Sequence, residues 1–114
     1  MPAEKKFNND IESLQEKLQS IKSQEGIIGY ILRGPNSASI DLKNPKKIID
    51  YATLSATAFE TGQDISAMFE NGEVDSIIME GENTRILSIV VKDHRLSIFM
   101  EKNVDHNTLY KNLK

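Results

Sequence analysis

The sequence predicts an α+β domain: an antiparallel five-stranded sheet with one long helix and two flanking helices, in the order α-β-β-α-β-β-β-α. Two observations lead to this fold class. Two stretches repeat apolar residues with a helical period, and five short runs rich in β-branched residues lie between turn-forming residues. At 114 residues the chain is long enough for one core and too short for two, so we expect a single domain over residues 1–114.

The first predicted helix runs to about Ser23. Its apolar residues recur at spacings of four and three and form one narrow stripe: Phe7, Ile11, Leu14, Leu18 and Ile21. Its start has two readings, because Asn9 and Glu12 could form a capping box, whereas a start near Ala3 would place Phe7 inside the helix. Polar residues cover the remaining surface, so we expect this helix on the outside of the domain.

Two strands follow this helix. Ile27–Arg33 is continuously apolar, which is typical of a central strand covered on both faces, and Gly34-Pro35-Asn36 then supplies a turn. Ser37–Leu42 alternates apolar and polar residues, so we expect a half-exposed strand that pairs back as a hairpin.

The longest element is a helix over Pro45–Asn71. Asn44 is a suitable N-cap, Pro45 suits the first helical position, and Gly72 suits a left-handed stop. Its 27 residues would span about 40 Å, at least the diameter of a compact domain of this size. One chain cannot easily cover a helix of this length. Inside it, Gly62 lowers helix stability, which indicates a packing reason or a local kink.

Two faces of this long helix are apolar. With Ile49 beside it, the row expected against the sheet is Ile48, Ala52, Ala56, Phe59, Gln63, Ser66 and Phe69. A second set is displaced around the axis: Tyr51, Leu54, Ala58, Ile65 and Met68. Two interpretations of this second set stay open, a wide core stripe and a stripe that faces a partner.

Three strands and a short helix complete the chain. The strands Val74–Glu80, Arg85–Lys92 and Arg95–Glu101 form a meander, with a tight turn at Asp93-His94. Asp105 is placed to cap a last helix that carries a small apolar patch. If Val74–Glu80 lies at the sheet edge, its backbone invites pairing with another chain, although Glu73, Asp75 and Glu80 could blunt that edge.

Composition argues against several classes of function. The net charge of −3 gives no case for nucleic acid or an anionic membrane, and no segment is apolar enough to be inserted in a bilayer or to act as a signal peptide. We therefore expect a cytoplasmic protein whose partners are proteins. The absence of cysteine excludes disulfides and thiolate chemistry.

No catalytic or metal-binding pattern is present, so we expect no enzyme activity, no metal and no cofactor. His94 and His106 are not spaced for a metal or a base, and we expect both to be solvated. Arg33, Arg85 and Arg95 lie at strand ends; we expect ordinary solvated charges, the alternative being an arginine finger for a nucleotidase partner.

The order of elements resembles the roadblock/dynein light-chain family of small-GTPase regulators and scaffolds. The resemblance spans about Phe7–Leu113 and rests on the strand GIIGYILRG, the long helix ending in FENGE, and the meander SIIMEG, ILSIVVKD and RLSIFME. The hairpin RGPNSASI departs from the family pattern, in which an acidic residue and a glycine are common. The resemblance implies a homodimer or heterodimer, joined through the long helices and the strands after them, that binds a Ras-like small GTPase.

The residues expected at the dimer or partner interface come from the long helix and the next strand: Tyr51, Leu54, Ala58, Gly62, Ile65, Met68, Val74, Ser76 and Ile78. Ala58→Glu is expected to dissociate the dimer and leave the monomer folded. The alternative is a monomeric longin-like or profilin-like module, acting in trafficking or ligand sensing, with a peptide or small molecule bound beside the sheet.

Overall fold

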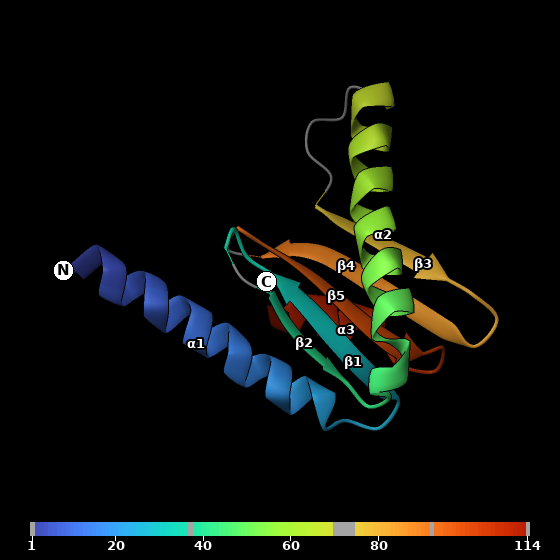
Figure 1. The fold of residues 1–114 in the computed structure, drawn as a ribbon, viewed down its shortest axis with the longest axis horizontal. Coiled ribbons are helices and arrows are strands. Elements are labelled where there is room, and N and C mark those ends of the chain that lie inside the picture. Colours follow the sequence, from blue (N-terminus) through green and yellow to red (C-terminus); the bar gives the residue numbers. More distant parts are fainter. Residues whose placement is uncertain (1, 37, 70–74, 92, 114) are drawn as a thin grey trace.

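Five antiparallel strands form one sheet in the order β2-β1-β5-β4-β3, with helices on both faces (Figure 1). The computed structural model describes residues 2–36, 38–69, 75–91 and 93–113. The elements are α1 Pro2–Lys22, β1 Ile27–Arg33, β2 Ala38–Leu42, a 3₁₀ turn η1 Pro45–Lys47, α2 Ile48–Phe69, β3 Ser76–Glu80, β4 Thr84–Val91, β5 His94–Glu101 and α3 His106–Leu113. The predicted fold class and order of elements are confirmed.

The sheet is built from one hairpin and one three-stranded meander, joined by a long connection that contains α2. β1 pairs with β2 on one side and β5 on the other, and β5-β4-β3 is the predicted meander. β1 is buried over most of its length, as its continuous apolar character predicts, whereas β2 is half-exposed at one edge. β3 lies at the other edge of the sheet.

Gly29 in β1 marks a point where two backbones approach closely. Its φ is +156°, and a Cβ atom added there would lie 2.3 Å from the carbonyl oxygen of Asp41 in β2. The register of β1 against β5 shifts between Ile27 and Gly29, which is typical of a bulge. Glycine is therefore required at this position by space as well as by backbone conformation.

Most of the hydrophobic core lies between the sheet and the helices α1 and α3. Leu14, Leu18 and Ile21 of α1 are buried there, as their spacing predicts, together with Leu109 and Leu113 of α3. Helix α1 begins at Pro2, which agrees with the earlier of its two predicted starts. Asp105 caps α3 as expected, because its Oδ1 accepts hydrogen bonds from the backbone N–H groups of Asn107 and Thr108.

Among the described elements, α2 is the helix that covers the other face of the sheet (Figure 1). A smaller core lies under the start of this helix, where Ile48 and Tyr51 pack against Ile31, Ile86 and Phe99. The side chain of Asn44 accepts a hydrogen bond from the N–H of Lys46, which confirms the predicted cap. The predicted helix end, Asn71 and Gly72, lies outside the described residues.

The rotation of α2 about its axis differs from the expectation. Ile49 is 80% exposed and Gln63 is exposed, although both were placed at or beside the sheet-facing row. The buried positions are instead Ser55, Ala58 and Gly62. One physical reason is size, because small side chains let the helix backbone approach the sheet closely. In the described part of the chain, no helix is long and apolar enough to cross a membrane.

Candidate protein interaction surface

One side of α2 exposes an apolar row made of Leu54, Ile65 and Met68, which we call the α2 row. These side chains are 39%, 42% and 74% exposed, respectively. Spacings of eleven and three residues place them on one side of a helix. All three belong to the predicted interface, so this part of the predicted second face is on the surface of a single chain.

The other predicted residues of α2 lie differently. Ala58 is fully buried and Gly62 is buried, so both face the sheet of their own chain. Tyr51 is half-buried, with its ring centroid 4.5 Å from that of Phe99. Because Ala58 has no exposed surface, its burial argues against the expectation that Ala58→Glu leaves the monomer folded: the new carboxylate would lie in the helix–sheet contact.

A chain of three buried hydroxyls explains why α2 turns this side to the sheet. Ser55 of α2 and Ser88 of β4 both contact Ser97 of β5, with Oγ–Oγ distances of 2.7 and 2.8 Å. All three side chains are nearly inaccessible to solvent. Ser88 and Ser97 are paired within the sheet, whereas the buried Ser55 hydroxyl finds its partner, Ser97, only when α2 sits in this rotation, so this hydrogen bond favours it. A count of apolar residues cannot find this contact.

The open edge of β3 is the second part of the surface, and we call it the β3 edge. The carbonyl of Asp75 accepts from the N–H of Val90 in β4, so by alternation the backbone groups of Ser76, Ile78 and Glu80 point away from the sheet. Ser76 and Ile78 belong to the predicted interface, and Ile78 is 40% exposed. Val74, also predicted there, lies outside the described residues.

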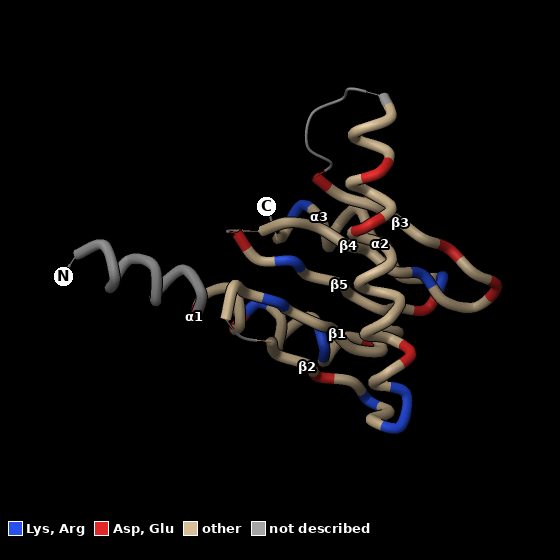
Figure 2. The backbone as a smooth tube through the Cα atoms, turned by 45° about the horizontal axis from the view of Figure 1, so that its top comes forward, with Lys and Arg blue, Asp and Glu red and all other residues tan. Residues whose placement is uncertain are grey.

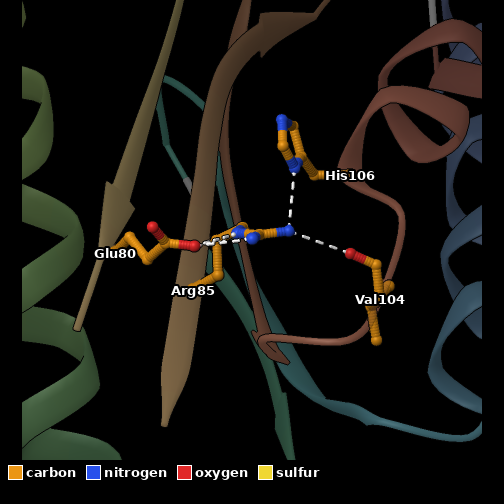
Figure 3. Close-up of polar contacts among 4 residues, drawn as sticks. All are labelled: Glu80, Arg85, Val104 and His106. Carbon is orange, nitrogen blue, oxygen red and sulfur yellow. Dashed lines mark hydrogen bonds and ion pairs between the residues drawn. The ribbon is translucent and has the colours of Figure 1, made fainter. Parts of the chain in front are cut away.

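Contacts from β4 and α3 hold the two ends of the β3 segment in place. At one end, Nε of Arg85 in β4 donates to the Glu80 carboxylate at 3.1 Å (Figure 3). Nη1 of the same side chain donates to the Val104 carbonyl at 3.1 Å and to His106 Nδ1 at 3.0 Å. At the other end the Tyr110 hydroxyl donates to Asp75 at 2.7 Å. The hydrogen bond from Arg85 holds the pKa of Glu80 below its usual value. The β3 edge is therefore fixed by contacts on its inner side.

Two expectations about ionisable residues are wrong at this site. The Arg85 side chain is only 17% exposed, and His106 is half-buried with its Nδ1 facing the guanidinium, so neither is simply solvated. Arginine can only donate, so Nδ1 of His106 is the acceptor in this hydrogen bond. These contacts depend on strand register, which brings together residues that are far apart in the sequence.

His94 also differs from the expectation of a solvated turn residue. It begins β5 and is only 6% exposed. Asp93, just before it, takes the left-handed conformation that the tight turn requires, with φ of +64°. The predicted turn is Asp93-His94, but His94 already belongs to β5 and pairs with Val91 of β4 in the sheet.

A groove of about 470 Å³ lies between the second half of α2 and the adjacent strands. Its walls are small, apolar and polar side chains with charged groups at one end: Phe59, Gly62, Gln63, Ser66, Ala67, Asp75, Ser76, Ile77, Ser88, Val90, Asp93 and Arg95. Among the described residues, no group of three or more histidine or acidic side chains is arranged to hold a metal ion. The arrangement is suited to binding a protein or a ligand.

Comparison with known proteins identifies the fold. Neither a protein-family model nor a curated protein matches the sequence. A Roadblock/LC7 domain from Streptomyces avermitilis matches the structure with a TM-score of 0.67 and 14% identity, over 87% of this chain and 83% of that one. The gliding protein MglB from Thermus thermophilus matches with a TM-score of 0.64 and 15% identity, over 89% and 82%. The resemblance seen in the sequence is thus confirmed for the fold, and the chain has the fold of a Roadblock/LC7 domain.

Proposed function

We propose that this chain forms a homodimer that regulates or holds a small Ras-like GTPase and performs no catalysis of its own. The observation that carries the proposal is the open β3 edge, which follows the helix that bears the exposed α2 row. The shared fold with the Roadblock/LC7 domain and the gliding protein MglB supports it. We infer a small GTPase as the partner from the sequence resemblance to a family of GTPase regulators and scaffolds. We also propose a cytoplasmic location.

Pairing of two β3 edges is compatible with the charges on the strand. A two-fold axis centred on Ile78 pairs all five residues of β3 with those of a second copy. Ser76 then lies opposite Glu80 of that copy, so no two carboxylates oppose each other. Glu80 is also partly neutralised by its ion pair with Arg85. Of the three charges expected to blunt this edge, Glu80 therefore does not prevent pairing, and Glu73 lies outside the described residues.

The α2 row gives such a dimer an apolar contact in addition to backbone hydrogen bonds. Both copies of α2 would lie on the same face of a continuous sheet, because the two-fold axis passes through the β3 edge perpendicular to that sheet. The GTPase would then bind the composite surface made by both copies. It would be held there, or its own catalytic groups would be arranged for faster hydrolysis.

The first test is the mass of the purified protein in solution. Light scattering at tens of micromolar should give twice the chain mass of 12.8 kDa, and a clean monomer would remove the basis of the proposal. The second test measures binding and single-turnover GTP hydrolysis with the small Ras-like GTPases of the source organism. Wild type should bind one of them, and Ile65→Glu, a monomer in this account, should bind more weakly. No binding and no rate change with any of them would refute the GTPase role.

The groove beside α2 supports a second candidate function, a monomeric longin-like or profilin-like binding module. Its volume of about 470 Å³ is large enough for a small molecule or part of a peptide. This alternative predicts a monomer whose melting temperature rises with a ligand, and a dimer with no such shift would count against it. The state of assembly therefore separates the two functions.

A further inference from the structure

Two of the three arginines of the chain lie directly opposite each other on neighbouring strands. Arg33 of β1 is the register partner of Arg95 of β5. Arg33 is two residues from Ile31 on β1, and Arg95 is four residues from Phe99 on β5. Residues at even spacings point to the same face of a sheet, and Ile31 and Phe99 pack under α2, so both arginines project from the face that carries α2. Like charges in directly opposed positions of an antiparallel pair destabilise the sheet. We call these two residues the arginine pair.

In the described part of the chain no ion pair involves the arginine pair. Asp75 and Asp93 nevertheless line the same groove as Arg95. Arg85 provides the contrast within this protein, because its guanidinium is occupied by Glu80, the Val104 carbonyl and His106 (Figure 3).

Both guanidinium groups of the pair are nevertheless held in position. Arg33 Nη2 donates to the carbonyl of Ala52 in α2 at 3.2 Å. The guanidinium carbon of Arg95 lies 5.4 Å from the ring centroid of Phe59, also in α2. Each group is therefore anchored to α2 by one contact, and most of its N–H donors remain for a ligand. Positioned charges that lower folding stability are typical of binding sites.

The surroundings of the pair are those of a protein interface. Val90, Arg95, Arg33 and Ala38 form one row across four strands, with the apolar residues at its two ends. Val90 is 38% exposed, and Ala38 and Arg95 are exposed. Arginine is enriched in protein interfaces, where guanidinium groups bind carboxylates in a bidentate geometry. The row would be a poor site for a small free anion, since apolar groups flank it.

We propose that the arginine pair binds carboxylate side chains of a protein partner on the sheet surface beside α2. Two carboxylates about one strand spacing apart, ~5 Å, would each meet one guanidinium and relieve the repulsion between the two arginines. The inference deepens the proposed function and rests on it for the identity of the partner, the small GTPase. The binding chemistry itself does not depend on dimerisation.

Arginine side-chain NMR tests this proposal without the GTPase. The protein has only three arginines, so its Nε–Hε signals report Arg33, Arg85 and Arg95 separately. The probe is a blocked tetraglutamate peptide, titrated at constant ionic strength. The signals of Arg33 and Arg95 should move with one shared dissociation constant, while that of Arg85 stays in place. Arg95→Gln should weaken binding at least five-fold.

Lys46→Gln is the matched control, because it also removes one positive charge. Figure 2 shows basic positions gathered at the turn between β2 and α2. Lys46 lies exposed in this turn, which begins where the Lys43 N–H donates to the Ile28 carbonyl at the start of β1, whereas Arg33 ends that strand. This variant should keep the wild-type dissociation constant. Equal shifts at Arg85, a response from one member of the pair alone, or equally tight binding of inorganic phosphate would overturn the proposal. Failure of GTPase binding with a positive titration would refute the proposed partner and leave the carboxylate site standing.

Discussion

Two substitutions on α2 compare a position buried against the sheet with a position in the exposed α2 row, two turns further along the helix. Ala58 is fully buried, whereas Ile65 is 42% exposed. The same glutamate introduced at each position adds the same charge to the same helix. Any difference in stability therefore reports burial within one chain.

The expected magnitudes differ several-fold. At Ala58 a carboxylate would be buried without a partner, which costs several kcal/mol and is a large part of the ~5–15 kcal/mol that stabilises a typical domain. Ile65→Glu loses the burial of rather more than half of one isoleucine, whose full burial is worth about 1.5–3 kcal/mol, so the expected loss is about 1 kcal/mol. Ala58→Glu should be largely unfolded, and Ile65→Glu should be folded.

Urea denaturation followed by circular dichroism measures both losses, and light scattering measures assembly. We expect Ile65→Glu to be a folded monomer, since its carboxylate would face the second copy. A stable Ala58→Glu with an unchanged urea midpoint would refute the packing of α2 described here. A dimeric Ile65→Glu would exclude the α2 row from the dimer interface.

Three further predictions concern the fold. Ser97→Ala leaves the buried hydroxyls of Ser55 and Ser88 without their shared partner and should cost about 1–3 kcal/mol in urea denaturation; replacing all three serines by alanine should cost less than three such losses, and strict additivity would argue against the hydroxyl chain. Gly29→Ala should cost at least about 2 kcal/mol by the same assay, since its Cβ meets the Asp41 carbonyl, and a neutral effect would contradict that close approach. Hydrogen bonds from Thr108 lower the pKa of Asp105 below 3.8, so its stabilising contribution is present above that pH and is lost as pH falls through the folded value. Asp105→Asn removes this titration, so its melting temperature should fall less than that of wild type between neutral pH and pH ~2, and identical profiles would contradict the assignment.

The parts of the fold that depend on local sequence were predictable. The stripe of Leu14, Leu18 and Ile21 identifies the buried side of α1, because these large side chains recur with the period of the helix. The strands and the Asn44 cap followed in the same way from β-branched runs and capping chemistry. The sequence predicts that β3 invites pairing only if this strand lies at a sheet edge. The strand order places it at an edge.

The rest of the site depends on residues that are distant in the sequence. Ser55 is hydrogen bonded to Ser97, 42 positions away, and this contact rather than apolar period decides which side of α2 is buried. Arg85 meets Val104 and His106 only because β4 and β5 are in one particular register. The arginine pair also results from register, since nothing near Arg33 in the sequence points to Arg95.

Cysteine cross-linking across the proposed dimer axis tests the central claim most directly. The protein contains no cysteine, so Ile78→Cys introduces a single thiol at the centre of the β3 edge. In the proposed dimer it lies opposite its own copy, with a Cα separation of about 5 Å that a disulfide can bridge. Oxidation should give a cross-linked dimer on a non-reducing gel, and Ser76→Cys, which would face Glu80 of the second copy, should cross-link far less. An Ile78→Cys protein that stays monomeric on that gel, or cross-links no faster than Ser76→Cys, would contradict the edge-to-edge dimer.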